Sequence, residues 1–444
     1  MSTQTQHIAI AGAGLVGSLL AVYLLKRGYA VTLYERRPDM RKITIGGGRS
    51  INLALSHRGI RALREVGLDT ILEDKAIPMH GRMIHGYSGD LTFQPYGKEG
   101  QFINSISRSG LNMELMDAVE KHGGTIIFEA RCLEVDLEKT ELTIAHGIRT
   151  EVKSYDLIIG ADGAFSAIRS VMQVTDRFTY SQEYLEHGYK ELTIPPGKDG
   201  SFLIEKNALH IWPRDSFMLI ALPNPDGNFT CTLFFPFEGK QSFENLNSDE
   251  EVYSFFEREF PDALKLMPTL AEDFSKNPTC SLVTVRCYPW IRNKTFVIGD
   301  AAHALVPFYG QGMNAGFEDC RVLNDLLNTF EDDWDKVLPE FQQQRKPDTD
   351  AIAQLAIDNF IEMRDLVGDE DFILRKKIEA KLHELYPDKW IPQYSMVTFH
   401  DDVRYSEALL KGRKQRLIMD EVMIRSDIHK RWRSLNFEEI VNQL

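Results

Sequence analysis

The chain has 444 residues, of which 43% are hydrophobic, and its formal net charge at pH 7 is −14. A chain of this length can bury a large core, and we expect it to divide into two or three domains. The acidic balance, without a long basic run, argues against nucleic acid as a partner. The cysteines are few, odd in number and without metal-ligand spacing, so we expect no metal site and a reducing, cytoplasmic setting.

The longest uncharged run extends from residue 8 to residue 25. By hydropathy alone it could be taken for a membrane span or a signal anchor. However, no Lys or Arg precedes it, and it contains Gly12, Gly14 and Gly17 in a Gly-x-Gly-x-x-Gly pattern. We therefore expect no membrane anchor.

The same run predicts a nucleotide-binding βαβ unit. Residues 7–11 are predicted to form a strand, residues 15–27 a helix and residues 30–34 a second strand that ends at Glu35. The glycines permit a tight turn and close approach of a pyrophosphate, and Glu35 would accept hydrogen bonds from an adenosine ribose. Because its carboxylate would repel a ribose 2′-phosphate, the unit favours FAD or NAD over NADP. The alternative is a glycine-rich turn without a ligand.

Three further segments carry candidate ligand residues. Arg108 is predicted in the first turn of a helix, where a cation opposes the helix dipole. Its side chain could bind a phosphate or carboxylate, or it could simply face solvent. Asp162 follows the strand 155–159 in Gly-Ala-Asp-Gly, where it could face a ligand or cap the next helix. The glycine-rich stretch 46–49 could approach a flat or phosphorylated group, or be only a flexible loop.

The stretch 297–314 predicts a flavin site. A buried strand ends at Asp300, a turn-rich loop containing Pro307 follows, and a helix begins near Gly312, Met313 and Asn314. The N-terminus of a helix favours an anion or a ring that becomes anionic. Asp300 accepts hydrogen bonds and suits the hydroxyls of a polyol. A polyol attached to such a ring describes a flavin with its ribityl chain.

Changes in periodicity predict an α/β fold with a discontinuous first domain. We expect residues 1–177 and 286–345 to form the dinucleotide domain and residues 178–285 an inserted antiparallel sheet, to which the hairpin 80–97 contributes. Residues 346–444 are expected to be helical. Within them, residues 392–399 are predicted to be extended, and Asn359 lies on an apolar helical stripe with Met363, where it would need a partner if buried.

Taken together, the motifs resemble those of the class A flavoprotein aromatic hydroxylases, the para-hydroxybenzoate hydroxylase-like group. The glycine pattern with its terminal acid, Gly-Ala-Asp-Gly at 160–163 and Gly-Asp at 299–300 occur in the order typical of that group. Within it, Gly-Arg-Met at 81–83, His-Gly-Tyr-Lys-Glu-Leu at 187–192, Asn-Ala-Leu-His-Ile-Trp-Pro at 207–213 and Tyr-Ser-Met-Val-Thr-Phe at 394–399 are similar to the kynurenine 3-monooxygenases. The similarity extends from about residue 7 to residue 399. The charged tail resembles the soluble bacterial form.

This resemblance implies an FAD-dependent enzyme that uses NADPH and O₂ to hydroxylate L-kynurenine to 3-hydroxykynurenine through a flavin C4a-hydroperoxide. No residue is assigned as acid or base, because the ring amine activates the substrate and the flavin performs the chemistry. The implied fold is a Rossmann-type FAD-binding domain with an inserted antiparallel substrate domain and C-terminal helices. The implied FAD contacts are Gly12, Gly14, Gly17, Glu35, Arg36, Arg108, Asp162, Asp300, Pro307, Gly312, Met313 and Asn314. The implied substrate contacts are Arg82, Tyr96, Asn359 and Tyr394 for the carboxylate, and Leu209, Ile220, Phe234, Phe308 and Met363 for the ring.

Two other functions are compatible with the same motifs. One is a related flavin enzyme, such as a halogenase or a hydroxylase of another aromatic acid; the halogenase-type Trp-x-Trp-x-Ile-Pro pattern is absent, and Arg82 favours an amino-acid carboxylate. The other is a flavin-binding protein without turnover. Only one dinucleotide fingerprint is present, so the sequence does not reveal where NADPH binds. The assembly state is also undecided: the chain could be a monomer or a homodimer.

Overall fold

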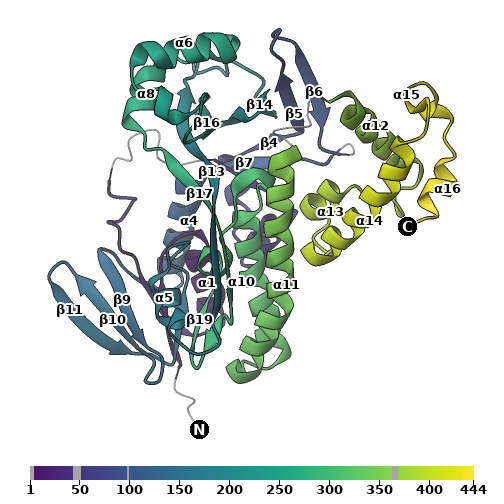
Figure 1. Ribbon diagram of the computed structural model, residues 1–444. Coiled ribbons are helices and arrows are strands. Elements are labelled where there is room, and N and C mark those ends of the chain that lie inside the picture. Colours follow the sequence, from purple (N-terminus) through teal and green to yellow (C-terminus); the bar gives the residue numbers. More distant parts are fainter. Residues whose placement is uncertain (1–4, 44–51, 98–99, 363–368) are drawn as a thin grey trace.

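The computed structural model describes residues 5–43, 52–97, 100–362 and 369–444 (Figure 1). Its first sheet confirms the predicted βαβ unit: β1 (His7–Ala11) and β2 (Ala30–Tyr34) pair in parallel, and α1 (Leu15–Lys26) connects them. The strand order is β18-β19-β12-β1-β2-β8. The remaining strands are β8 (Thr125–Ile127), β12 (Leu157–Gly160), β18 (Ile291–Arg292) and β19 (Thr295–Val297).

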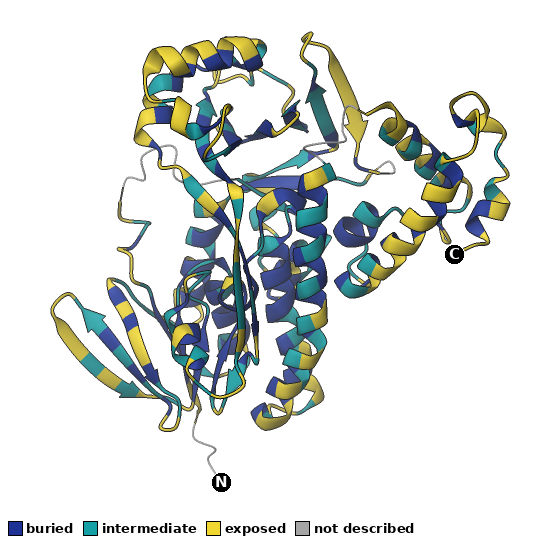
Figure 2. Cartoon of the chain, viewed as in Figure 1, coloured by how far each residue is buried: buried dark blue, intermediate teal, exposed yellow. Residues whose placement is uncertain are grey.

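Helices cover this sheet and bury it. The central strands are apolar along their whole length because a parallel sheet is covered on both faces, and Ile8, Ile10, Ile158 and Phe296 are fully buried. Figure 2 shows the buried residues concentrated in the sheet and in the helices against it. These helices are α1, α4 (Arg108–Lys121), α5 (Ala167–Gln173), α9 (Asp300–His303) and α10 (Gly312–Thr329).

Two three-stranded sheets flank this domain. One has the order β3-β7-β4, with β3 (Asn52–Leu55), β7 (Ile103–Ser107) and β4 (Ala76–Met79); β7 leads directly into α4. The helices α2 (His57–Glu65) and α3 (Ile71–Lys75) lie between its strands in sequence. The other sheet contains β9 (Ala130–Asp136), β10 (Glu141–His146) and β11 (Arg149–Ser154).

A seven-stranded sheet forms the second layered unit, in the order β17-β13-β16-β15-β14-β5-β6. Its pairings are antiparallel except for β14–β5, so the early hairpin joins the sheet edge in parallel. Side chains of β15 alternate: Phe217 and Leu219 pack under α6 (Asp249–Glu259), α7 (Pro261–Leu264) and α8 (Leu270–Lys276), whereas Met218 and Ile220 face the other way. The strands are β5 (Gly81–His85), β6 (Leu91–Pro95), β13 (Thr179–Ile194), β14 (Ala208–Arg214), β15 (Phe217–Pro223), β16 (Phe229–Pro236) and β17 (Cys280–Tyr288).

The C-terminal part is helical, and one prediction within it is wrong. Residues 392–399 were expected to be extended, but Gln393–Phe399 form the helix α13. Burial of the consecutive residues 395–399 overrides the weak helix propensity of their aromatic and β-branched side chains. The other helices are α11 (Trp334–Ile361), α12 (Glu370–Leu385), α14 (Tyr405–Met423), α15 (Ile428–Arg431) and α16 (Phe437–Val441).

The long helix α11 crosses the expected domain boundary between residues 345 and 346. It contains Pro339 and Pro347, which break the sequence pattern of a helix without ending it. It packs against both α10 and α14, so it joins the first sheet to the C-terminal helices. The domain boundaries therefore remain a prediction.

A buried ion network fixes the C-terminal helices to the first domain. Arg345 donates to Asp319 at 2.8 Å and to Glu318 at 2.7 Å, and Arg58 donates to Glu318 at 2.6 Å. Arg58 also donates to the carbonyl oxygen of Val397 at 3.0 Å, which ties α13 to α2. Although burial opposes ionisation, the guanidinium charges help to lower the pKa of both Glu318 and Asp319. The network thus holds α13 in place.

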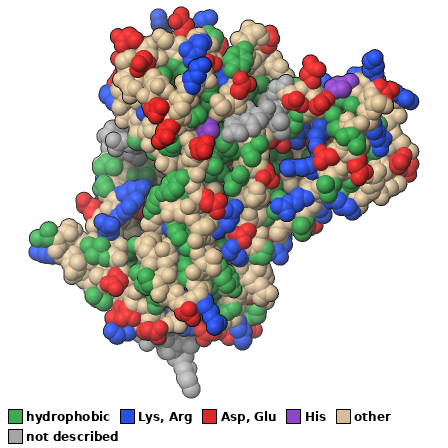
Figure 3. Space-filling view, in the orientation of Figure 1, with side chains coloured by type: hydrophobic (Ala, Val, Ile, Leu, Met, Phe, Trp, Pro, Cys, Tyr) green, Lys and Arg blue, Asp and Glu red, His purple; other side chains and the backbone are tan. Residues whose placement is uncertain are grey.

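On the face shown in Figure 3, acidic and basic side chains are interspersed. Within the ranges described above, no helix is both long enough and apolar enough to cross a bilayer.

Candidate functional site

A single cavity of about 490 Å³ runs from the first sheet to the inner face of the seven-stranded sheet. Glu35 and Arg131 line it near the carboxyl ends of β1 and β2, whereas Arg82, Tyr96 and Tyr394 line it at the far end. Ligands of α/β sheets bind beyond the carboxyl ends of the strands. The cavity therefore extends from a nucleotide position into a second, more enclosed pocket.

The three glycines of the fingerprint have different roles. A Cβ on Gly12 would lie 2.5 Å from the carbonyl oxygen of Ala161, and its φ of +100° is itself unfavourable for other residues. A Cβ on Gly17 would overlap the carbonyl oxygen of Gly12, and Gly17 does not line the cavity. Gly14 has no such neighbour and lines the cavity. Gly12 and Gly17 thus allow the turn to close, and Gly14 leaves its backbone open to a ligand.

Glu35 and Arg36 lie together at the nucleotide end of the cavity. Oε2 of Glu35 accepts a hydrogen bond from the Ala13 amide at 3.1 Å, and Oε1 accepts one from the Arg37 amide at 2.9 Å. The carboxylate therefore also fixes the glycine turn. Because a carboxylate has about four acceptor positions, it retains capacity for a ribose hydroxyl.

The structure answers one of the alternatives left open for Asp162. Oδ2 accepts hydrogen bonds from the amides of Ala167 at 2.7 Å and Ile168 at 3.3 Å, so Asp162 does cap the following helix. Oδ1 is buried and has no partner among the described residues. Burial raises the pKa of Asp162. Since Asp162 also lines the cavity, its second oxygen is available to a ligand donor.

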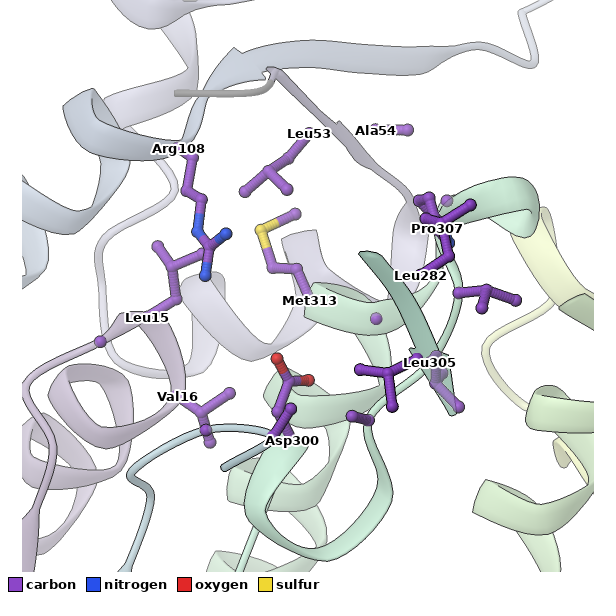
Figure 4. Close-up of a pocket in the computed structure, with 18 of the residues that line it drawn as sticks. Leu15, Val16, Leu53, Ala54, Arg108, Leu282, Asp300, Leu305, Pro307 and Met313 are labelled. Carbon is purple, nitrogen blue, oxygen red and sulfur yellow. The ribbon is translucent and has the colours of Figure 1, made fainter. Parts of the chain in front are cut away.

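Arg108 and Asp300 enter the middle of the cavity from opposite sides, with Met313 beside them (Figure 4). Pro307 and Gly312 line the same section. The helix α10 begins there without a side-chain cap and without an acidic residue in its first turn. Its free N–H groups and positive dipole end therefore remain available to a partly anionic ring.

Asn314 does not line the cavity, although it was predicted to contact the flavin. Its side chain is fully buried, and Oδ1 accepts from the Ser56 amide at 2.9 Å. Nδ2 donates to the carbonyl oxygens of Ala54 and Gly310, each at 2.8 Å. Asn314 thus holds β3 against the loop that precedes α10.

At the far end of the cavity, an arginine and two tyrosines surround a position suited to an anion. The guanidinium carbon of Arg82 lies 5.0 Å from the ring centre of Tyr394 and 5.6 Å from that of Tyr96. The two rings are stacked with centroids 5.5 Å apart. Nε of Arg82 and the hydroxyl of Tyr96 are buried without a hydrogen-bond partner in the part of the chain described. Unpartnered buried donors are costly, which indicates that a ligand satisfies them.

Four of the predicted wall residues line this pocket: Leu209, Ile220, Phe234 and Phe308. Asn359 does not; its Nδ2 donates to the carbonyl oxygen of Phe308 at 2.6 Å, which gives the buried amide a partner and positions the loop. Met363 lies outside the described residues.

Sequence reasoning missed several lining residues. Met218 and Leu222 line the cavity on either side of Ile220, and the two-residue period of a strand could have identified both. Tyr309, which the sequence places in the flavin loop without a defined role, stacks on Tyr394 with centroids 5.5 Å apart, and burial raises the pKa of Tyr309 well above its usual value. It extends the aromatic stack from the arginine pocket to the flavin loop.

Comparisons with known proteins identify the family of the chain. Residues 5–356 match a family model described as an FAD binding domain. The chain is 50% identical over 442 residues to a protein of Christiangramia forsetii named kynurenine 3-monooxygenase, covering 99% of this chain and 98% of that protein. A protein of the same name from Sus scrofa is 47% identical over 425 residues, covering 95% of this chain and 89% of its own length.

Solved structures support the fold. A tetrameric form of 2-methyl-3-hydroxypyridine-5-carboxylic acid oxygenase superposes with a TM-score of 0.67 at 22% identity, covering 82% of this chain and 94% of that chain. PqsL of Pseudomonas aeruginosa, described as a probable FAD-dependent monooxygenase, gives a TM-score of 0.65 at 18% identity, covering 82% and 97%. The predicted FAD-binding hydroxylase fold is therefore confirmed.

Proposed function

The chain belongs to the kynurenine 3-monooxygenase family, and from that premise we propose that it hydroxylates L-kynurenine to 3-hydroxykynurenine with bound FAD, NADPH and O₂. The observation that carries this proposal is the pair of unpartnered donors on Arg82 and Tyr96, at the end of a cavity whose other end suits a dinucleotide. A guanidinium is the natural partner of a carboxylate, and a tyrosine hydroxyl adds a neutral donor.

The residues present fit FAD. Both α1 and α10 begin at the cavity without side-chain caps or acidic first turns, which suits a pyrophosphate at one helix and an electron-accepting ring at the other. When bound, FAD would supply the redox chemistry between NADPH, O₂ and the substrate ring. Gly17 and Asn314 would shape the site without contacting the cofactor. We propose that the residues in contact with FAD are Gly12, Gly14, Glu35, Arg36, Arg108, Asp162, Asp300, Pro307, Gly312 and Met313.

For the substrate, the protein would supply position and a dry environment. Arg82, Tyr96 and Tyr394 would hold the amino-acid carboxylate, while Phe234 and Phe308, whose ring centroids are 4.9 Å apart, would exclude water around the aromatic ring. We assign no side chain as acid or base, because the ring amine of kynurenine activates the carbon next to it. Asn359 would act through Phe308, whose carbonyl it holds.

We further infer that the enzyme works in the cytoplasm, as a monomer or a homodimer, with domains close to the ranges predicted above. The five free cysteines support a reducing compartment. Sedimentation of the purified protein would distinguish the two assembly states.

The decisive experiment is NADPH oxidation by the purified protein with and without L-kynurenine, with the product identified by mass. Fast oxidation with a product heavier by one oxygen atom is the expected result. Fast oxidation that yields only peroxide would preserve the flavin assignment and exclude L-kynurenine as the true substrate. No stimulation would contradict the proposed function.

A further inference from the structure

A chain of hydrogen bonds lies on the face of the seven-stranded sheet opposite the cavity, behind the strand that carries Arg82. On β5, Arg82 faces the cavity, whereas His85, three residues later, faces the other side. Nδ1 of His85 lies 2.7 Å from Oδ2 of Asp262, and its Nε2 lies 2.9 Å from Nδ1 of His210. Nε2 of His210 lies 2.7 Å from the carbonyl oxygen of Glu205. Both histidines are buried.

These bonds supplement a weak attachment of the β5–β6 hairpin. β6 is exposed along its length and forms the edge of the sheet, so β5 reaches the remaining strands through its parallel pairing with β14. Parallel pairing is slightly less stable per residue than antiparallel pairing. His85 adds a stacked contact with Trp212, with centroids 3.9 Å apart, to its hydrogen bonds. The His85 side chain is therefore a main tie between the hairpin and the interior of the sheet.

The donors and acceptors require an extra proton on this chain. A carbonyl oxygen only accepts, so His210 donates from Nε2, and one of the two rings must donate across the contact between His85 Nε2 and His210 Nδ1. Ionised Asp262 also only accepts, and it already receives the Trp212 indole N–H at 2.8 Å. His85 must therefore donate from Nδ1, so the two rings together hold one proton more than their neutral forms.

The protonation tendencies agree with this geometry. Burial lowers the pKa of His210 to about 4, which opposes a second proton on that ring. Burial opposes ionisation of Asp262, but the hydrogen bonds from His85 and Trp212 lower its pKa to about 2. An ionised carboxylate thus faces the His85 ring.

Other charged groups face the histidine pair from neighbouring elements. Arg214 donates from Nη1 to the carbonyl oxygen of His85 at 3.2 Å, and its positive charge opposes a second one nearby. Several carboxylates offset it: Asp262, Glu259, Asp215 and, beside His210, Glu205; the neutral phenol of Tyr87 also lies nearby. The balance leaves Asp262 as the carboxylate in direct contact with His85.

We propose that His85, held between Asp262 and His210, is a positioning residue that fixes β5 so that Arg82 meets the substrate carboxylate. This inference rests on the proposed function. Without these hydrogen bonds the hairpin loses one of its ties to the sheet, and Arg82 binds the carboxylate less well.

The test replaces His85 with a neutral side chain. His85→Gln should raise the KM for L-kynurenine about tenfold, since a hydrogen bond to a charged group is lost, and should leave kcat within about twofold. Leu91→Ala is the matched control, because Leu91 pairs with His85 in the hairpin but is 60% exposed and lies outside the hydrogen-bond chain.

A substrate analogue separates positioning from general damage. Kynuramine lacks the carboxylate, so His85→Gln should not weaken its binding further. Equal losses for kynuramine and L-kynurenine, or an unchanged KM for L-kynurenine, would overturn the inference. If His85→Gln does not retain FAD, Asp262→Asn replaces it as the test variant. Asp262→Asn should also raise the KM for L-kynurenine, and an unchanged KM would overturn the inference. A wild-type enzyme that L-kynurenine does not stimulate would instead refute the proposed function, before any variant is made.

Discussion

Arg82 on β5 and Tyr394 on α13 meet at the end of the cavity, with 5.0 Å between the guanidinium carbon and the ring centre. A cation over an aromatic face is stabilised without using up all its N–H donors, and the buried Nε of Arg82 has no partner among the described residues. The two residues belong to the edge hairpin and to the C-terminal helices. The anion site is therefore complete only when both units are docked.

Replacing Arg82 should remove substrate binding without removing the cofactor. For Arg82→Met we expect a loss of at least about 2 kcal/mol in L-kynurenine binding, as is usual when one partner of a buried charge pair is truncated. Arg82→Lys should recover part of the loss, because it restores the charge but not the planar fork. Titration of the flavin absorbance with L-kynurenine measures affinity, and the absorbance of the purified protein gives the FAD content. Parallel loss of FAD would show that Arg82 supports the fold rather than the substrate.

Tyr96→Phe should affect affinity and stability in opposite directions. The buried hydroxyl has no partner among the described residues, so its removal relieves a cost in the unliganded protein, on the order of 1 kcal/mol. We expect an unchanged or higher Tm without substrate and a several-fold higher KM for L-kynurenine. Thermal melts with and without L-kynurenine check both parts. A lower Tm in the unliganded variant would indicate that the hydroxyl has an internal partner.

The nucleotide end of the site could be predicted because its chemistry is local. The glycine pattern, Glu35 and Asp300 lie next to strands and helices whose periodicity is clear, and parallel strands bring their ends to one sheet edge. The residues that line the other end were identified through family resemblance. Their spacing along the chain alone does not bring Arg82 near Tyr394.

The remaining features depend on tertiary contacts that no local pattern encodes. Asn314 and Asn359 were expected to contact ligands, yet both amides hold backbone carbonyls beside the cavity. A sequence does not specify which way an amide points. Likewise, α13 is helical because its surroundings bury it, and the His85 chain joins residues from three separate segments.

Alanine at two glycines should separate folding from cofactor binding. A Cβ at position 17 would overlap the Gly12 carbonyl, so Gly17→Ala should lower both Tm and FAD content. A Cβ at Gly14 meets no atom within 4 Å apart from its chain neighbours, and Gly14 lines the cavity, so Gly14→Ala should lower FAD affinity while leaving the Tm of the apoprotein nearly unchanged. Melting curves of FAD-free protein and FAD titrations distinguish the two effects. A destabilised Gly14→Ala apoprotein would contradict the assignment.

Glu191 is expected to destabilise the folded protein at alkaline pH. It pairs in register with Thr232, a cavity-lining residue, and its Oε2 is buried without a partner among the described residues. Burial raises the pKa of Glu191 to about 7, despite the opposing charge of Arg108. Between its unfolded pKa and this value the folded state holds a proton that the unfolded state releases, so stability decreases as pH rises through that window.

Glu191→Gln should remove this penalty, because the amide resembles the protonated carboxyl. We expect the variant to be more stable than the wild type at pH 8.5, by roughly 1–3 kcal/mol, and nearly equal to it at pH 5. Thermal melts at the two pH values measure the difference. Glu183→Gln is the matched control on the same strand, since the side chain of Glu183 is 58% exposed and should give no pH-dependent shift. An equal Tm shift of Glu191→Gln at both pH values would show that charge burial is not the cause.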